Sequence, residues 1–473
     1  MTRSPILLLA AFLGLSGCAS MQPGRGFDDV QRSVSERTGM QVHWDNGSPD
    51  DEEAATAVRS LLEHELTPEA AVQVALLNNR ALQAIYEELD IAQADLVQAG
   101  LLNNPVFGGE VRFATDGGGS GVVLDLTQEF VSLLYMPLRK GRAGAEFEAA
   151  KLRVTLAVLD LAGETRIAFY EYQAAQQLLE MRRSVAEATA ASYELAKRLR
   201  EAGNNRDLDV SNERALHEQS RLDLAAAEAA VFQRREELNE LMGLWGPDTG
   251  WNSGERLPEI PAEEVSPDGL EQHAVERSLD LAVARREIEV AARTLGIARP
   301  MALLGELDAG VAAEREVEGG WSVGPSFALS IPLFDQGQAA TGKARAQLSQ
   351  AAHKYVAEAV SLRARVRAAY LAVTAARDRA QYYAGIVLPL RQQIVDQTQL
   401  QYNAMQIGAF QLLQAKRDQI EAGARYIDAL RDYWIARTTL DQILSGRSTR
   451  PGSRLADSPA PFQKGAMTSG GGH

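Results

Sequence analysis

The chain of 473 residues contains a single cysteine, and aromatic residues make up only 6% of it. No disulfide can therefore form within the chain. A net charge of −15 argues against a nucleic-acid partner, whose phosphates require a cationic surface. No apolar run has the length of a spanning helix, and no spacing is typical of a nucleophile–base pair, a phosphate loop or a metal site. We therefore expect no enzyme activity, no cofactor and no bound metal.

Two unusually long helices are predicted instead, over residues 138–202 and 336–407. In the first, apolar or small residues recur at alternating steps of three and four, which is typical of one helical face. At 1.5 Å per residue, about 65 residues form a rod roughly 100 Å long. Such a rod needs long partners to bury its stripe, and return helices are predicted over 205–243 and 409–446.

Before each rod the sequence predicts a β-hairpin, over residues 105–131 and 300–334. Phe107 and Val111 alternate with Glu110 and Arg112, so the two sets lie on opposite faces of a strand. The acidic residues expected on the polar faces are Glu110, Asp125, Glu129, Glu306 and Asp308.

The whole pattern occurs twice, as helix, hairpin, long helix and long return helix. Residues 67–245 form the first repeat, 246–266 a linker and 267–446 the second repeat, followed by a disordered tail over 447–473. The matching features are Thr67-Pro68-Glu69 with Ser266-Pro267-Asp268 as helix starts, Pro105 with Pro300, Tyr170 with Tyr370, and Gly203 with Gly408. The polar, acidic stretch 18–66 is expected to be an extended tether.

The hairpins indicate a membrane protein. The hairpins are expected at the far end of the long rods, where the neighbouring helices are poor candidates for burying an apolar face. Strands of about 9–11 residues can instead span an outer membrane with apolar side chains outward. Four strands cannot close a barrel, and open edges are not tolerated in lipid. Three copies would supply about twelve strands. The predicted fold is mainly α with a small membrane β-barrel, continued by an α-helical tunnel.

The amino terminus resembles a bacterial lipoprotein signal. A basic start and an apolar run of about ten residues precede Leu15-Ser16-Gly17-Cys18. The resemblance implies that residues 1–17 are removed and that Cys18 is acylated. Ala19 at the next position favours sorting to the outer membrane. The alternative is an ordinary signal peptide with an incidental cysteine.

Residues 67–446 resemble the TolC family of outer-membrane factors, in particular its lipoprotein members. The resemblance rests on the duplicated plan, on the strand-to-rod junction from Ile331 to Gly337 and its looser copy from Tyr135 to Gly141, and on the turn from Gly408 to Leu413. It implies a homotrimeric exit duct in the outer membrane with its helices in the periplasm. It also implies a periplasmic adaptor and an inner-membrane pump as partners.

The resemblance assigns roles to the helix turns. The turn residues that would meet the adaptor are Gly203, Asn204, Asn205, Gln406 and Gly408. The family's two aperture aspartates fall on Gln414 and Arg417, so an acidic gate is not expected there, although Asp418 is adjacent. Asp207 and Asp209 are candidate substitutes, with ordinary helix capping as the alternative.

The leading functional hypothesis is a passive conduit for drugs, metal ions or other small toxic compounds, gated by an iris-like shift of the tip helices. The acidic hairpin residues would then favour cations, unless any polar residue suffices in that position. The alternatives are a non-conducting, lipid-anchored scaffold that spans the periplasm, or a duct for type I protein secretion.

Overall fold

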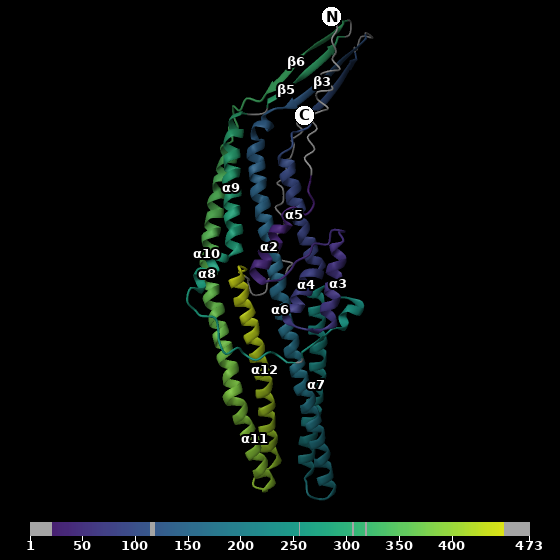
Figure 1. Cartoon of the computed structure of the whole chain (residues 1–473), viewed down its shortest axis with the longest axis vertical. Helices are drawn as coiled ribbons and strands as arrows, with labels where there is room; N and C mark the ends of the chain where they lie inside the picture. The colour runs from purple at the N-terminus through teal and green to yellow at the C-terminus, as the bar shows by residue number, and fades with distance from the viewer. Residues whose placement is uncertain (1–20, 114–118, 255, 305–306, 317–318, 449–473) are drawn as a thin grey trace. The chain divides into compact units, whose positions relative to one another are not determined.

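The computed structural model describes residues 21–113, 119–254, 256–304, 307–316 and 319–448. The chain forms two compact units, each assembled from separate stretches. Figure 1 labels helices and strands of the chain. The first unit draws on Met1–Ser33, Ala84–Thr155 and Leu279–Ser361. The second draws on Val34–Gln83, Leu156–Ser278 and Leu362–His473.

Helices dominate both halves of the chain. The elements up to the middle of the chain are α2 (Phe27–Thr38), α3 (Asp50–Glu63), β1 (Glu65–Leu66), α4 (Pro68–Asn78), α5 (Arg80–Ala99), β2 (Val106–Phe113), β3 (Ser120–Glu129), α6 (Val131–Glu201) and α7 (Asp207–Met242). They are followed by η1 (Gly246–Gly250), β4 (Asn252–Ser253), α8 (Leu270–Arg277), α9 (Leu279–Leu304), β5 (Leu307–Arg315), β6 (Trp321–Leu329), α10 (Gln338–Tyr382), η2 (Tyr383–Val387), α11 (Leu388–Asn403) and α12 (Ala409–Ser445).

The predicted duplication is confirmed. Helices α4 and α5, hairpin β2–β3 and helices α6 and α7 are repeated as α8 and α9, β5–β6, α10–α11 and α12. Helix α6 has 71 residues and continues through Pro137, so it begins earlier than predicted. The second rod is not a single α-helix, because the π-helical segment η2 separates α10 from α11 just before Pro389. Proline lacks the N–H of a regular helical bond, and a π-turn is one way to accommodate it.

The two hairpins form one antiparallel sheet in the first unit, in the order β2-β3-β5-β6. Strands β3 and β5 pair from Val122 with Arg315 to Glu129 with Asp308, which joins the two repeats. Strands β2 and β6 are the edges of this sheet within the chain. Pro325 lies in the edge strand β6, where the missing N–H is tolerated.

The prediction of an extended tether over residues 18–66 is wrong for its described part. Helices α2 and α3 occupy most of it, and Val30, Val34 and Trp44 are almost fully buried. Val30 and Val34 are four residues apart and therefore share one face of α2. In the first unit Lys151 also binds Asp29, with 2.8 Å between Nζ and Oδ2. This segment is thus a folded part of the molecule.

One predicted helix start is confirmed and its repeat is not. Thr67 caps α4 by accepting the N–H of Ala70 at 3.1 Å, with Pro68 in the first turn. Ser266-Pro267-Asp268 does not start a helix, because α8 begins at Leu270 after Gly269 in the left-handed region. Pro300 lies within α9, so it does not mark the start of a strand as Pro105 does.

The second unit is a row of antiparallel helices joined by three seams. Between α6 and α7, Thr189 Oγ1 lies 2.6 Å from Ser220 Oγ. Between α6 and α12, the rings of Tyr170 and Trp434 stack with centroids 5.1 Å apart. Arg391 of α11 and Asp418 of α12 form an ion pair at 2.8 Å. The order in the row is therefore α7, α6, α12 and then α10–α11.

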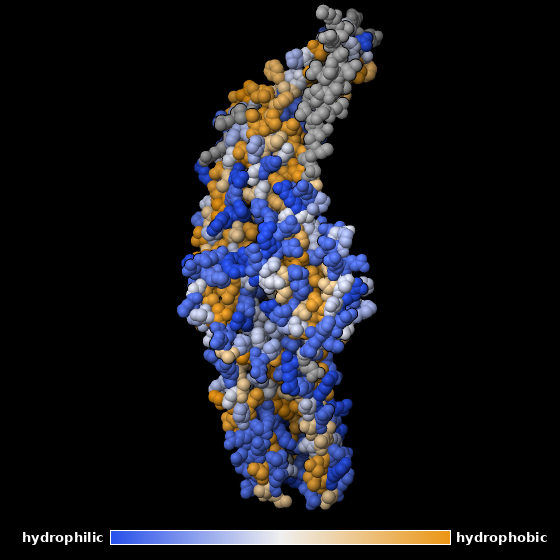
Figure 2. Space-filling view, in the orientation of Figure 1, coloured by the Kyte–Doolittle hydropathy of each residue, from blue (hydrophilic) through white to orange (hydrophobic). Residues whose placement is uncertain are grey.

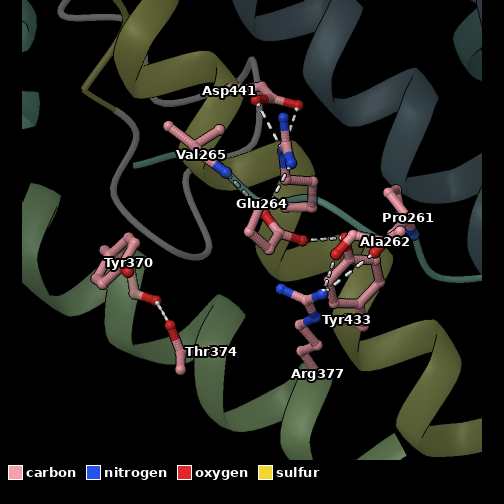
Figure 3. A network of polar contacts seen from close by, with 10 residues as sticks. Pro261, Ala262, Glu264, Val265, Tyr370, Thr374, Arg377, Tyr433 and Asp441 are labelled. Atoms are coloured by element: carbon pink, nitrogen blue, oxygen red, sulfur yellow. Dashed lines mark hydrogen bonds and ion pairs between the residues drawn. The ribbon is translucent and has the colours of Figure 1, made fainter. Parts of the chain in front are cut away.

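The segment between the repeats is bound to this row. On the side of the first repeat, Trp251 is buried, and its Nε1–H donates to Asn239 at 2.7 Å. On the side of the second repeat, Glu264 accepts hydrogen bonds from Arg437 and Tyr433, while Arg377 donates to the carbonyl of Ala262 (Figure 3). The predicted linker is therefore a strap that contacts helices of both repeats.

Candidate channel surfaces

The β-sheet has one polar face, and the pairing register places the predicted acidic residues on it. Opposed residues in antiparallel strands project to the same side of a sheet. Asp125 opposes Gly108 and Ala312, and Glu129 opposes Asp308. Glu110 opposes Val123, two residues from Asp125, and so shares this face. Glu306 lies outside the described residues.

Two further charged residues lie on this face: Arg112, which the sequence placed beside Glu110, and Glu314, which the sequence interpretation missed. The Arg112 guanidinium donates two hydrogen bonds to Glu110, at 2.9 and 3.1 Å. It also approaches Glu314 of β5 at 4.0 Å. The period-two alternation already indicated that Arg112 shares the face of Glu110. The polar face is thus acidic overall, with one arginine between two glutamates.

The opposite face of the sheet is apolar and open. Phe107, Leu124 and Val311 lie on it, and Figure 2 shows hydrophobic residues in the part of the molecule that holds the sheet. Phe327 is 82% exposed and Phe113 is 79% exposed. A soluble sheet would bury such a face against a core. An exposed face of this size indicates contact with lipid or with another protein.

The turn between α6 and α7 is closed as predicted around Gly203. Its φ is +80°, the left-handed region that favours glycine. The Asn204 N–H donates to the Leu199 carbonyl at 2.8 Å, and the Gly203 N–H donates to the Arg200 carbonyl at 2.9 Å. This pattern is a Schellman motif, which satisfies the last carbonyls of a helix. Asn204 is exposed and Asn205 is half-buried at this tip.

The turn between α11 and α12 uses a different residue from the one predicted. Met405 occupies the left-handed position with a φ of +56°, and the Gln406 N–H donates to the Gln401 carbonyl at 2.9 Å. Gly408 has a φ of −81° and is the N-cap of α12. The match of Gly408 with Gly203 is therefore wrong, and Met405 is the structural counterpart. Gln406 and Gly408 remain exposed at the tip.

Both acidic residues after the first turn are held by nearby arginines. Arg200 binds Asp207 through two hydrogen bonds, one of them 3.2 Å long. This bond to the Arg200 guanidinium holds the pKa of Asp207 below its usual value. Arg206 binds Asp209 at 3.0 and 3.3 Å. Arg206 is itself the N-cap residue of α7 and makes no side-chain cap, so the expectation that Asp207 caps this helix is not met.

The candidate aperture positions on α12 also contact their own hairpin. Asp418 accepts hydrogen bonds from Arg391 of α11 at 2.8 Å and from Gln414 at 2.7 Å. Arg417 is exposed, one position away. The described residues thus bring Gln414 and Asp418 together, whereas Arg417 points elsewhere on the helix.

Two further properties concern the described residues alone. Among them, no three His, Cys, Asp or Glu side chains are grouped so as to hold a metal ion. Among the described helices, none combines the length and the apolar character needed to cross a membrane.

Comparison with known proteins gives consistent results. Residues 270–446 match the family described as Outer membrane efflux protein. The cobalt-zinc-cadmium resistance protein CzcC of Cupriavidus metallidurans is 26% identical over 390 residues, which are 80% of this chain and 90% of that protein.

Solved structures share the fold. The structure of CusC, described as a transmembrane channel, has a TM-score of 0.67 at 16% identity and covers 83% of this chain and 92% of its own. The CmeC outer membrane channel of Campylobacter jejuni has a TM-score of 0.68 at 14% identity and covers 86% and 89%. The second repeat thus matches the outer membrane efflux protein family, the relative spans most of the chain, and the chain has the fold of the CusC and CmeC outer-membrane channels.

Proposed function

We propose that three copies of the chain form a passive exit duct through the outer membrane. Energy comes from an inner-membrane pump, and a periplasmic adaptor joins the pump to the helix tips around Gly203 and Gln406. The observation that carries this proposal is the four-stranded sheet with one acidic face, one exposed apolar face and two open edges.

The open edges call for partners. Strands alternate in direction across the sheet, so β6 of one copy can pair antiparallel with β2 of the next. Backbone groups left unpaired in lipid cost several kcal/mol each, so a closed ring is the stable arrangement. Three copies give about twelve strands, enough to enclose a water-filled lumen. The apolar face then contacts acyl chains, and Glu110, Asp125, Glu129, Glu306 and Asp308 line the pore.

Divalent metal cations are the proposed cargo. The relative CzcC is named for resistance to cobalt, zinc and cadmium. Carboxylates that line a lumen raise the local concentration of cations without binding them tightly. Organic compounds are the alternative cargo.

Acylated Cys18 anchors the folded amino-terminal segment to the membrane. The acidic residues near the tips, Asp207, Asp209 and Asp418, narrow the closed aperture together with Gln414 and Arg417. Opening then requires the helical hairpins of the tip to move apart from one another.

Planar lipid bilayers test the duct. The purified protein should give discrete conductance steps and, under a gradient of zinc chloride, a reversal potential that indicates preference for the cation. Replacing Asp125 and Asp308 by Asn should reduce that preference several-fold, because each of the three copies loses two lumen charges. Arg315→Gln changes the charge of the apolar face and serves as the control. A correctly assembled protein that never conducts would instead be a scaffold.

A further inference from the structure

The two repeats keep the same helical register in the second unit, which identifies equivalent residues. On the long helices, equivalent positions are buried in both repeats, as for Leu161 with Leu362 and Ala168 with Ala369. The same spacing pairs Tyr172 with Val373 and Leu179 with Ala380, all of them buried. The expected match of Tyr170 with Tyr370 is therefore wrong by one residue. The counterpart of Tyr170 is Leu371.

The return helices also share a register. The positions buried in both α7 and α12 are Ser220 with Ala422, Ala227 with Ala429, and Leu238 with Leu440. By this spacing the counterpart of Trp434 is Phe232, and the counterpart of Gly423 is Arg221. Arg235 likewise matches Arg437, and both bind the strap between the repeats.

Helices α6 and α12 meet in an antiparallel seam within the chain. Tyr170 stacks on Trp434 with an interplanar angle of 26°. One end of the seam is tight because a side chain at Gly163 would collide with Gln442. Towards the tip, a Cβ at Gly423 would lie 3.1 Å from Met181 Sδ. The long helix of one repeat is thus fitted to the return helix of the other.

The equivalent pair of helices, α10 and α7, stand at the two ends of the row. Leu371 is 64% exposed and Phe232 is 68% exposed, although their counterparts Tyr170 and Trp434 pack on each other. Tyr382, the counterpart of Met181, is 58% exposed, and Arg221 is exposed too. Large apolar side chains on a helix face normally pack against a neighbour. The described part of the chain supplies no such neighbour for Leu371 and Phe232.

We propose that α10 of one copy packs on α7 of a second copy in the register of the α6–α12 seam, with Leu371 against Phe232 and Tyr382 against Arg221. The proposal rests on the assembly described under the proposed function and adds the residues that join neighbouring copies. The surfaces at the two ends of the row differ, so the contact is head-to-tail and repeats from copy to copy until a ring closes. Arg221 over the ring of Tyr382 adds a cation–π contact.

Cysteine cross-linking in intact outer membranes tests the register. The double variant Phe232→Cys with Leu371→Cys should give covalent oligomers with a short bis-maleimide, and so should Arg221→Cys with Tyr382→Cys. The matched control combines Phe232→Cys with Tyr382→Cys, which join exposed positions eleven residues, or roughly 16 Å, out of register. Each single variant retains Cys18 and shows whether that residue reacts. Only the two in-register pairs should yield covalent oligomers.

Several results would overturn the seam. Absence of cross-links from both in-register pairs, or equal yield from the control pair, would do so. The exchange of Phe232→Leu with Leu371→Phe should keep the oligomer's melting temperature, whereas Leu371→Asp alone should lower it; equal behaviour of the two variants would also contradict the packing. Bilayer conductance of the parent protein tests whether the duct conducts, independently of whether the proposed seam forms. Conduction without in-register cross-links refutes the seam alone, and cross-links in a protein that never conducts refute the duct alone.

Discussion

At the residue scale, Met405 has a left-handed backbone conformation that the sequence did not predict. Methionine rarely adopts the left-handed conformation, so nothing in the sequence marked it as the residue that ends α11, and nearby Gly408 was the natural choice. Met405→Gly should stabilise the turn by about 1 kcal/mol, because glycine reaches this conformation without a clash of its Cβ. Hydrogen exchange of the amides from Leu400 to Phe410 measures the change.

Gly203 provides the matched control for this prediction. Gly203→Met places a side chain in the left-handed position of the first turn and should destabilise that turn by a similar amount. If Met405→Gly lowered protection instead, the left-handed geometry at Met405 would be wrong.

At the element scale, the two tips differ in how they are held. Ion pairs hold the first through Arg200 with Asp207 and Arg206 with Asp209, whereas residues 397–415 around the second contain no charged side chain. The pKa of Asp207 lies below its usual 3.8, mainly because Arg200 bonds to the carboxylate. This pair therefore stabilises the tip above pH 3.8, and the stabilisation is lost as the pH falls through the lowered pKa.

Acidification should consequently loosen the first tip and spare the second. We expect hydrogen exchange at residues 199–210, corrected for intrinsic rates, to rise several-fold from pH 6 to pH 3, with little change at residues 400–410. Arg200→Gln should remove much of this dependence by raising exchange already at pH 6. Equal acceleration of both tips would show that the ion pairs do not hold the first one.

The elements predicted best were those with a local signal. Alternation along β2, β3, β5 and β6 was enough to place Glu110 and Phe327 on opposite faces, because side-chain direction in a strand depends only on position. The sequence analysis missed helices α2 and α3 because this stretch is polar and acidic overall. Its few large apolar residues, such as Val30, Val34 and Trp44, were therefore not recognised as buried. Their burial depends on contacts with distant helices, which no local pattern reports. Helix α9 continues through Pro300, where the local rule of a proline break failed.

At the scale of the whole molecule, the direction in which the apolar face of the sheet points decides whether the protein can assemble in the outer membrane. Phe327→Lys should impair assembly in the outer membrane at a cost of about 2–4 kcal/mol near the bilayer midplane, and Leu124→Lys should act similarly. Ser326→Lys, next to Phe327 but on the polar face, should be tolerated. The amount of folded oligomer recovered from outer membranes measures all three. Equal recovery for Phe327→Lys and Ser326→Lys would contradict the proposed facing.

The unpaired strands at either end of the sheet have a consequence for biogenesis. In the proposed assembly, a single copy cannot insert stably into a bilayer while the edges of β2 and β6 are unpaired, so insertion would have to follow association with other copies. The concentration of newly exported chains, rather than their affinity for lipid, would then limit the number of assembled ducts in a cell. A shortage of subunits would leave unassembled chains in the periplasm, exposed to its proteases.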